Sequence, residues 1–125
     1  MAITENVPYF RPGQEVTARA TTAIPVNTLV KIVSGGTGTR PHVAAAAAGD
    51  VAFGIAGREA AEGDHIRVVR EGIAPIIAGE SITAASAVAV GADGKAVASV
   101  DGTNTVGIAT ADAEADGYVP VALNL

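Results

Sequence analysis

The stretch from Gly79 to Ala98, GESITAASAVAVGADGKAVA, places apolar residues at every second position and is interrupted at Asp93-Gly94. Alternation over four to eight residues indicates a strand with one buried face, and an Asp-Gly pair between two such runs favours a tight turn. The stretch therefore predicts a β-hairpin, with strands at 86–90 and 95–100 on either side of 91–94. It carries almost no reactive side chains, so the function of the protein has to be inferred from other parts of the sequence.

Most of the remaining chain shows the same pattern, in short runs separated by Gly, Pro, Asp and Asn. Many short strands at regular spacing favour a small barrel or sandwich. Segments 44–48 and 58–62 contain helix-favouring residues but are too short to form stable helices alone, so we expect a loop with at most one helical turn at each. We predict further strands at 14–21, 28–33, 51–56, 65–70, 71–77, 106–109 and 118–123, of which 71–77 contains Pro75 and should lie at an edge or a bulge.

The sequence repeats itself at a spacing of 53 residues. Phe53-Gly54-Ile55-Ala56 is matched by Val106-Gly107-Ile108-Ala109, and a polar turn with Gly and Asp follows each copy. The alternating strand after the turn places Val119 at the position of Ile66. Because apolar residues keep the same parity in both copies, the same face of each strand should be buried.

The composition restricts the function classes. Of the 125 residues, 49% are hydrophobic but only 3% are aromatic, so the core consists mainly of Ala, Val and Ile and offers poor walls for a ligand pocket. The formal net charge of −5, with eight Lys and Arg residues dispersed along the chain, argues against direct binding of nucleic acid. The absence of Cys excludes disulfides and thiolate metal sites. We expect no membrane span and no signal peptide.

Three segments resemble chemical sites without meeting their requirements. Asp112 to Gly117 opens like a Ca²⁺ loop, but Leu123 stands where the bidentate Glu is required. We expect a turn with solvated carboxylates there, and a weak surface Ca²⁺ site stays open as an alternative. Asp64-His65 and His42 lack a defined nucleophile and a third metal ligand. The glycine-rich loop at 34–39 lacks the Lys of a phosphate-binding loop, so its glycines are expected to serve turns.

Residues 1–13 are predicted to form an extended N-terminal arm, because Pro8 and Pro12 favour extended backbone. The arm carries two of the four Tyr and Phe residues of the chain. Aromatic residues and Arg are the types that most often anchor interfaces. An alternative, that these side chains fold back over the chain's own barrel, stays open. The candidate interface residues are Val7, Tyr9, Phe10 and Arg11.

Five segments in this order and spacing resemble the capsid decoration, or cement, proteins of tailed bacteriophages. The similarity extends from about Pro12 to Leu123, and each segment alone is a generic β pattern. The segments are PGQEVT at 12–17, VAFGIAGREAAEGD at 51–64, VVR at 68–70, AGESITA at 78–84 and VGADGKA at 90–96.

This resemblance implies a small β-barrel or tulip-like domain that forms homotrimers. It also implies binding to the major capsid protein on the outer face of the capsid, at three-fold and quasi-three-fold positions. We accordingly expect an all-β fold with an arm at 1–13 and a β-barrel domain at 14–125, made in the host cytoplasm and placed on the virion surface. We expect no enzymatic activity, cofactor, metal, direct nucleic-acid contact or membrane contact.

Two other function classes stay open as alternatives. A small hydrolase would use Asp64 and His65, although the sequence singles out no nucleophile beside them. A carbohydrate-binding or accessory module would need an exposed ring platform, for which the chain offers only Tyr9, Phe10, Tyr118 and Phe53, and we expect Phe53 to be in the core.

Overall fold

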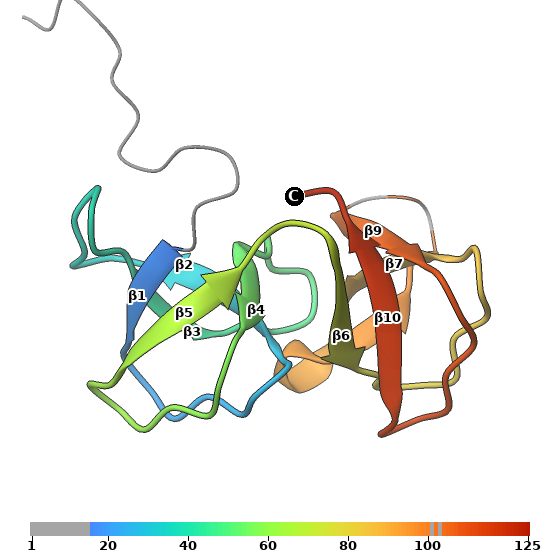
Figure 1. Ribbon diagram of the computed structural model, residues 1–125, viewed down its shortest axis with the longest axis horizontal. Coiled ribbons are helices and arrows are strands. Elements are labelled where there is room, and N and C mark those ends of the chain that lie inside the picture. The colour runs from blue at the N-terminus through green and yellow to red at the C-terminus, as the bar shows by residue number, and fades with distance from the viewer. Residues whose placement is uncertain (1–15, 101, 103) are drawn as a thin grey trace, which may run out of the picture.

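The computed structural model describes residues 16–100, 102 and 104–125, and within these residues the fold is all-β, as the sequence predicts. The strands form two units of five. The first is a closed barrel with the strand order β1-β3-β2-β4-β5, and the second is a five-stranded sheet with the order β6-β10-β9-β7-β8. Figure 1 shows the two units side by side, with the C-terminus between them. Where the sequence suggested one barrel, the described chain therefore contains two related units.

The first unit has its apolar residues on the inside of the barrel. β1 alternates strictly between buried and exposed positions, and β5 does the same over its first four residues. Antiparallel pairing of β1 with β5 and parallel pairing of β1 with β3 closes the barrel. The strands are β1 (Val16–Ala20), β2 (Leu29–Val33), β3 (His42–Ala45), β4 (Gly54–Ala56) and β5 (His65–Val69).

The second unit repeats this topology strand by strand. Its closure is weaker, because β6 and β8 are joined by a single parallel bridge between Ala78 and Ala96. A short 3-10 turn, η1 (Ala92–Gly94), connects β7 to β8 and confirms the predicted hairpin. The strands are β6 (Ile73–Ile77), β7 (Ala87–Val90), β8 (Ala96–Ala98), β9 (Thr105–Ala109) and β10 (Tyr118–Leu123).

The register of the second unit matches that of the first residue by residue. The isolated bridge Ile24–Ala60 corresponds to Ile82–Ala113. The pair Val30–Gly54 between β2 and β4 likewise corresponds to Val88–Gly107 between β7 and β9. Positions before the β2–β3 loop correspond at a spacing of 58 and positions after it at 53, since eight residues separate Val33 from His42 and three separate their counterparts, Gly91 and Lys95. The repeat found in the sequence is thus one part of a duplicated fold.

The repeated glycines allow a close approach between strands. A Cβ on Gly54 would lie 2.4 Å from Cγ1 of Val68 on the paired strand β5. At Gly107 the added carbon would lie 2.0 Å from the carbonyl oxygen of Ala122 on β10. No carbon atom is tolerated at these separations, so both copies of the fold require Gly at this position.

Part of the first barrel belongs to the core of the second unit. Leu29 and Ile55 belong to the first barrel, yet they pack in the same cluster as the buried residues of the second unit. The N–H of Ile77 also donates to the carbonyl of Asn27 across the junction at 2.9 Å. Other buried side chains of the first barrel, among them Ala18, Val43 and Ile66, form a separate cluster. The second unit is therefore completed by side chains of the first.

A local prediction differs from the structure at segment 44–48. Segment 44–48 was expected to be a loop, but Ala44 and Ala45 end strand β3, because pairing with β2 outweighs the helix propensity of Ala. Segment 58–62 contains no helical turn; Ala60 bridges to Ile24. Pro75 lies in β6, at the end of the sheet order, as expected for an edge. Pro120 lies in the inner strand β10, where it pairs with Pro75.

Candidate interaction surfaces

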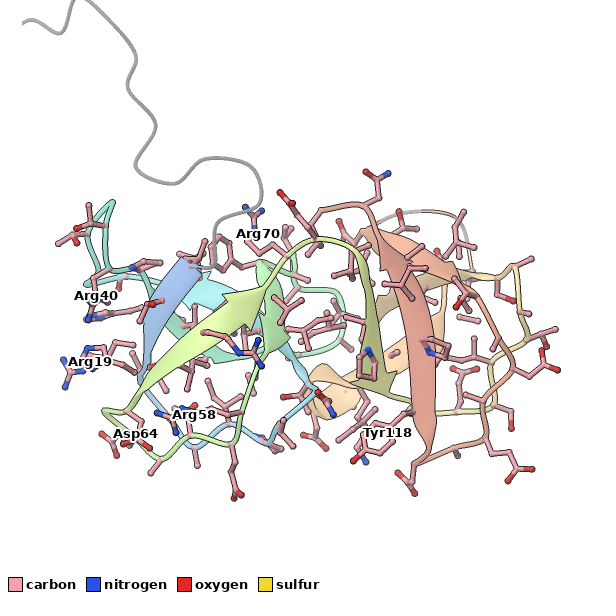
Figure 2. The ribbon with its side chains drawn as sticks, in the orientation of Figure 1. Arg19, Arg40, Arg58, Asp64, Arg70 and Tyr118 are labelled. Atoms are coloured by element: carbon pink, nitrogen blue, oxygen red, sulfur yellow. The ribbon has the colours of Figure 1, made fainter. Side chains whose placement is uncertain are left out.

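The four arm residues named from the sequence, Val7, Tyr9, Phe10 and Arg11, lie outside the described residues. The described part of the chain begins at Val16 in the first barrel. Val16 begins β1 and pairs with Val68, two residues before Arg70. The first described residue therefore lies beside the end of β5, close to Arg70, which Figure 2 labels.

An open groove of about 510 Å³ lies at this end of the barrel, and Leu125 contributes to its lining. The guanidinium carbon of Arg70 is 4.5 Å from the centre of the Phe53 ring, and its Nε donates to the Phe53 carbonyl at 2.8 Å. Phe53 was expected to be in the core, but its ring is only partly buried. This groove was not predictable from the sequence, because Arg70 and Phe53 are 17 residues apart and only the β4–β5 pairing brings them together.

A salt bridge also lines the groove. Nζ of Lys31 is 3.1 Å from a carboxylate oxygen of Asp50, and the same carboxylate accepts the N–H of Ala47 at 2.8 Å. The N–H of Ala47 and then the ammonium of Lys31 hold the pKa of Asp50 below its ordinary value. Asp50 is thus charged at neutral pH, and the groove presents paired charges beside an aromatic ring rather than a nucleophile and a base.

The acidic residues singled out in the sequence serve the turns. The carboxylate of Asp64 accepts the N–H of Ala61 at 2.9 Å, and that of Asp112 accepts the N–H of Ala84 at 2.7 Å. Asp116 forms a salt bridge with Lys95 at 3.1 Å. Within the described ranges, no three His, Asp or Glu side chains are grouped so that they could hold a metal ion.

The two histidines lie on different strands of the first barrel and do not form a common site with a nucleophile. His65 begins β5 with its side chain exposed, and its backbone carbonyl accepts a hydrogen bond from Arg58. His42 begins β3 and lies against Gly35 in the β2–β3 loop. The sequence brought Asp64 and His65 together as neighbours, whereas in the structure the carboxylate of Asp64 is directed to its own turn.

A helix able to cross a membrane does not occur in the part of the chain that the structure describes.

Seven outward residues of the second unit form an apolar face, which was not among the features predicted from the sequence. They lie on three adjacent strands, β6, β10 and β9, and none carries a charge. Ile73, Ile108 and Tyr118 are the most exposed, with 66%, 54% and 59% of their surface accessible. The sequence contains an indication of this face in 73–77 and 118–123, because both runs are apolar at odd and at even positions. The members of this apolar face are Ile73, Pro75, Ile77, Ile108, Tyr118, Pro120 and Ala122.

Comparison with known proteins gives two findings. A family model described as phage cement protein matches residues 10–124. Among solved structures, the chain is similar to the N base of the head fiber gp8.5 of bacteriophage phi29, with a TM-score of 0.76, 23% sequence identity, and coverage of 89% of this chain and 93% of that chain. The structural match supports the fold. No curated protein sequence matches this chain.

Proposed function

The chain belongs to the phage cement protein family, and from this we propose that it is a structural virion protein that binds the outer surface of a bacteriophage capsid and stabilises the shell. The observation that carries the proposal is the extent of the family match, which includes both five-stranded units. We place the binding positions at the three-fold and quasi-three-fold axes and the partner as the major capsid protein. We propose a homotrimer as the binding form.

The proposed mechanism is selective binding to the assembled shell. A protein that binds the closed lattice and not its dissociated or open forms stabilises the lattice by mass action. A trimer with one contact in each of three copies strengthens this effect, since the second and third contacts form at high effective concentration. A compact scaffold of small side chains suits this role, because it has surface to present and needs no substrate pocket.

The described surfaces support a binding role over a catalytic one. In the groove Lys31 is paired with Asp50, the carboxylate of Asp64 accepts an N–H of its own turn, and that of Asp112 accepts the N–H of Ala84. A nucleophile would need a base within hydrogen-bond reach. Asp64 and His65, the residues of the alternative hydrolase, do not provide this arrangement.

Cryo-electron microscopy of reconstituted capsids tests the proposal. Capsids of the same phage, assembled without this protein, are mixed with the purified chain and imaged, and their melting is followed in parallel. We expect added density on the outer surface at three-fold and quasi-three-fold positions and a higher capsid melting temperature. Capsids already saturated with the protein serve as the control. Bare capsids in the presence of a large excess of folded protein would overturn the proposal.

A further inference from the structure

The duplicated fold provides an internal comparison for the apolar face. Outward positions on β1 and β5 of the first barrel carry Thr17, Arg19, His65 and Arg67, all exposed. The corresponding outward positions on β6 and β10 carry Pro75, Ile77, Tyr118 and Pro120. In Figure 2 the labelled Arg19 lies on the first unit and Tyr118 on the second. The same topology therefore has a charged outer surface in one unit and an uncharged one in the other.

The register makes the apolar face continuous. Tyr118 lies opposite Ile77, and Pro120 lies opposite Pro75. Ala122 lies between Ile73 on one side and Ile108 on the other. A sheet with one face in water normally alternates apolar and polar residues, and strands that are apolar on both faces are typical of sheets covered on both sides. Exposed contiguous apolar surface of this kind marks an interaction site.

The first unit shows what covers such a position. Ile55 on β4 corresponds to Ile108 on β9, as Gly54 corresponds to Gly107. Ile55 is 1% exposed, because the second unit packs over it, whereas Ile108 is 54% exposed. The covering body at Ile55 is itself a copy of this five-stranded fold. The chain thus already contains one contact between two such units at the equivalent residue.

We propose that the apolar face formed by β6, β10 and β9 is the surface through which copies of this chain contact one another. The inference rests on the homotrimer of the proposed function and assigns its interface. Around a three-fold axis, residues near the axis face the same residues of two other copies, so any charge there is repelled by its own kind. The chain has a net charge of −5, and this face is free of charged side chains.

A charge introduced on this face tests whether copies of the chain contact one another there or whether the face has another role. Ile108→Glu adds one negative charge to this face, and Thr17→Glu adds the same charge to the exposed outer surface of the first barrel as the matched control. Tyr118→Ser removes apolar area without adding charge, and it serves if Ile108→Glu lowers the melting temperature of the fold. Analytical ultracentrifugation of the full chain without capsids measures the self-association constant of each variant.

We expect wild type and Thr17→Glu to form trimers with similar constants, and Ile108→Glu and Tyr118→Ser to weaken association at least about tenfold, while all remain folded. A folded Ile108→Glu protein that associates like the control would overturn the inference. So would a wild-type chain that stays monomeric at about 100 μM, or variants that keep their trimers but lose capsid binding, which would assign the face to the capsid. A wild-type monomer destabilised by deletion of residues 1–13 would assign the face to the arm.

These outcomes are distinct from failure of the proposed function. Wild-type trimers that leave bare capsids undecorated would overturn capsid binding and leave the interface assignment intact. Decorated capsids together with an unaffected Ile108→Glu trimer would overturn the interface assignment and leave capsid binding intact.

Discussion

Single residues with positive φ show how the duplicated turns are made. Asn27 and Ala85 occupy the same position before β2 and β7, with φ of 62° and 72°. The N–H of each donates to the equivalent carbonyl, that of Ala56 or Ala109. Asn tolerates the left-handed region because of its short polar side chain, whereas Ala has no such compensation. The second unit thus contains a strained turn that the first unit forms without strain.

Replacing Ala85 with Asn should stabilise the protein. The left-handed conformation costs an ordinary residue about 1–2 kcal/mol, and Asn recovers part of this cost. We expect Ala85→Asn to raise the free energy of unfolding by about 0.5–1 kcal/mol, measured by urea denaturation. Ala84→Asn, in the same exposed turn but without positive φ, is the control. Equal stability of the two variants would argue against strain at this turn.

Replacing the glycine at the repeated strand position should instead destabilise the protein. Gly107→Ala places a carbon 2.0 Å from the Ala122 carbonyl oxygen, so β9 and β10 must separate. We expect a loss of about 3 kcal/mol in the free energy of unfolding. Gly49→Ala has open space around its Cβ and a φ of 84°, so it should lose only about 1 kcal/mol. Similar losses in the free energy of unfolding for both variants would show that the close contact between β9 and β10 does not determine the effect of Gly107→Ala.

At the scale of elements, the N-terminal arm is expected to make a principal contact with the capsid. Deletion of residues 1–10 removes Tyr9 and Phe10, and interface anchors of this type contribute about 2 kcal/mol or more. We expect capsid binding to fall sharply while the melting temperature of the purified chain barely moves, because the deleted segment ends well before Val16, where β1 begins. Capsid titration and differential scanning calorimetry measure the two effects.

Two results would contradict this assignment. Full occupancy of capsids by the shortened chain, at concentrations where the intact chain just saturates, would exclude the arm as a principal contact. A clear drop in melting temperature would instead indicate that the arm packs on its own barrel. Changing both Tyr9 and Phe10 to Ser in the intact arm distinguishes lost side chains from lost length.

The strands were predictable wherever one face alone is buried. The runs 14–21 and 65–70 alternate clearly in the sequence and appear as β1 and β5. Strand β3 was missed, because its Ala residues carry no alternation and its pairing with β2 spans a loop. The hairpin turn at 91–94 was predictable because Asp93 and Gly94 both adopt positive φ there.

At the scale of the whole molecule, the family and the all-β class could be inferred from the sequence, but the two-unit architecture could not. The detected repeat covered β4, β5 and their counterparts, which share the 53-residue spacing. The spacing of 58 between β1 and β6 hid the rest, since the longer loop at 34–41 shifts the alignment by five residues. The apolar face could not be predicted either, because the fold decides whether the odd- or the even-numbered residues of β6 and β10 point outward.

The shared core has a consequence for the order of folding. The first barrel closes through its own strands, whereas the second unit has one bridge at its seam and uses Leu29 and Ile55 of the first. During synthesis the N-terminal half emerges first and can fold as a unit. It then presents a finished template on which the later strands assemble. Hydrogen exchange should accordingly find amides of β6 and β8 opening more readily than those of β1 and β5, so that the half of the molecule made last is also the first to come apart.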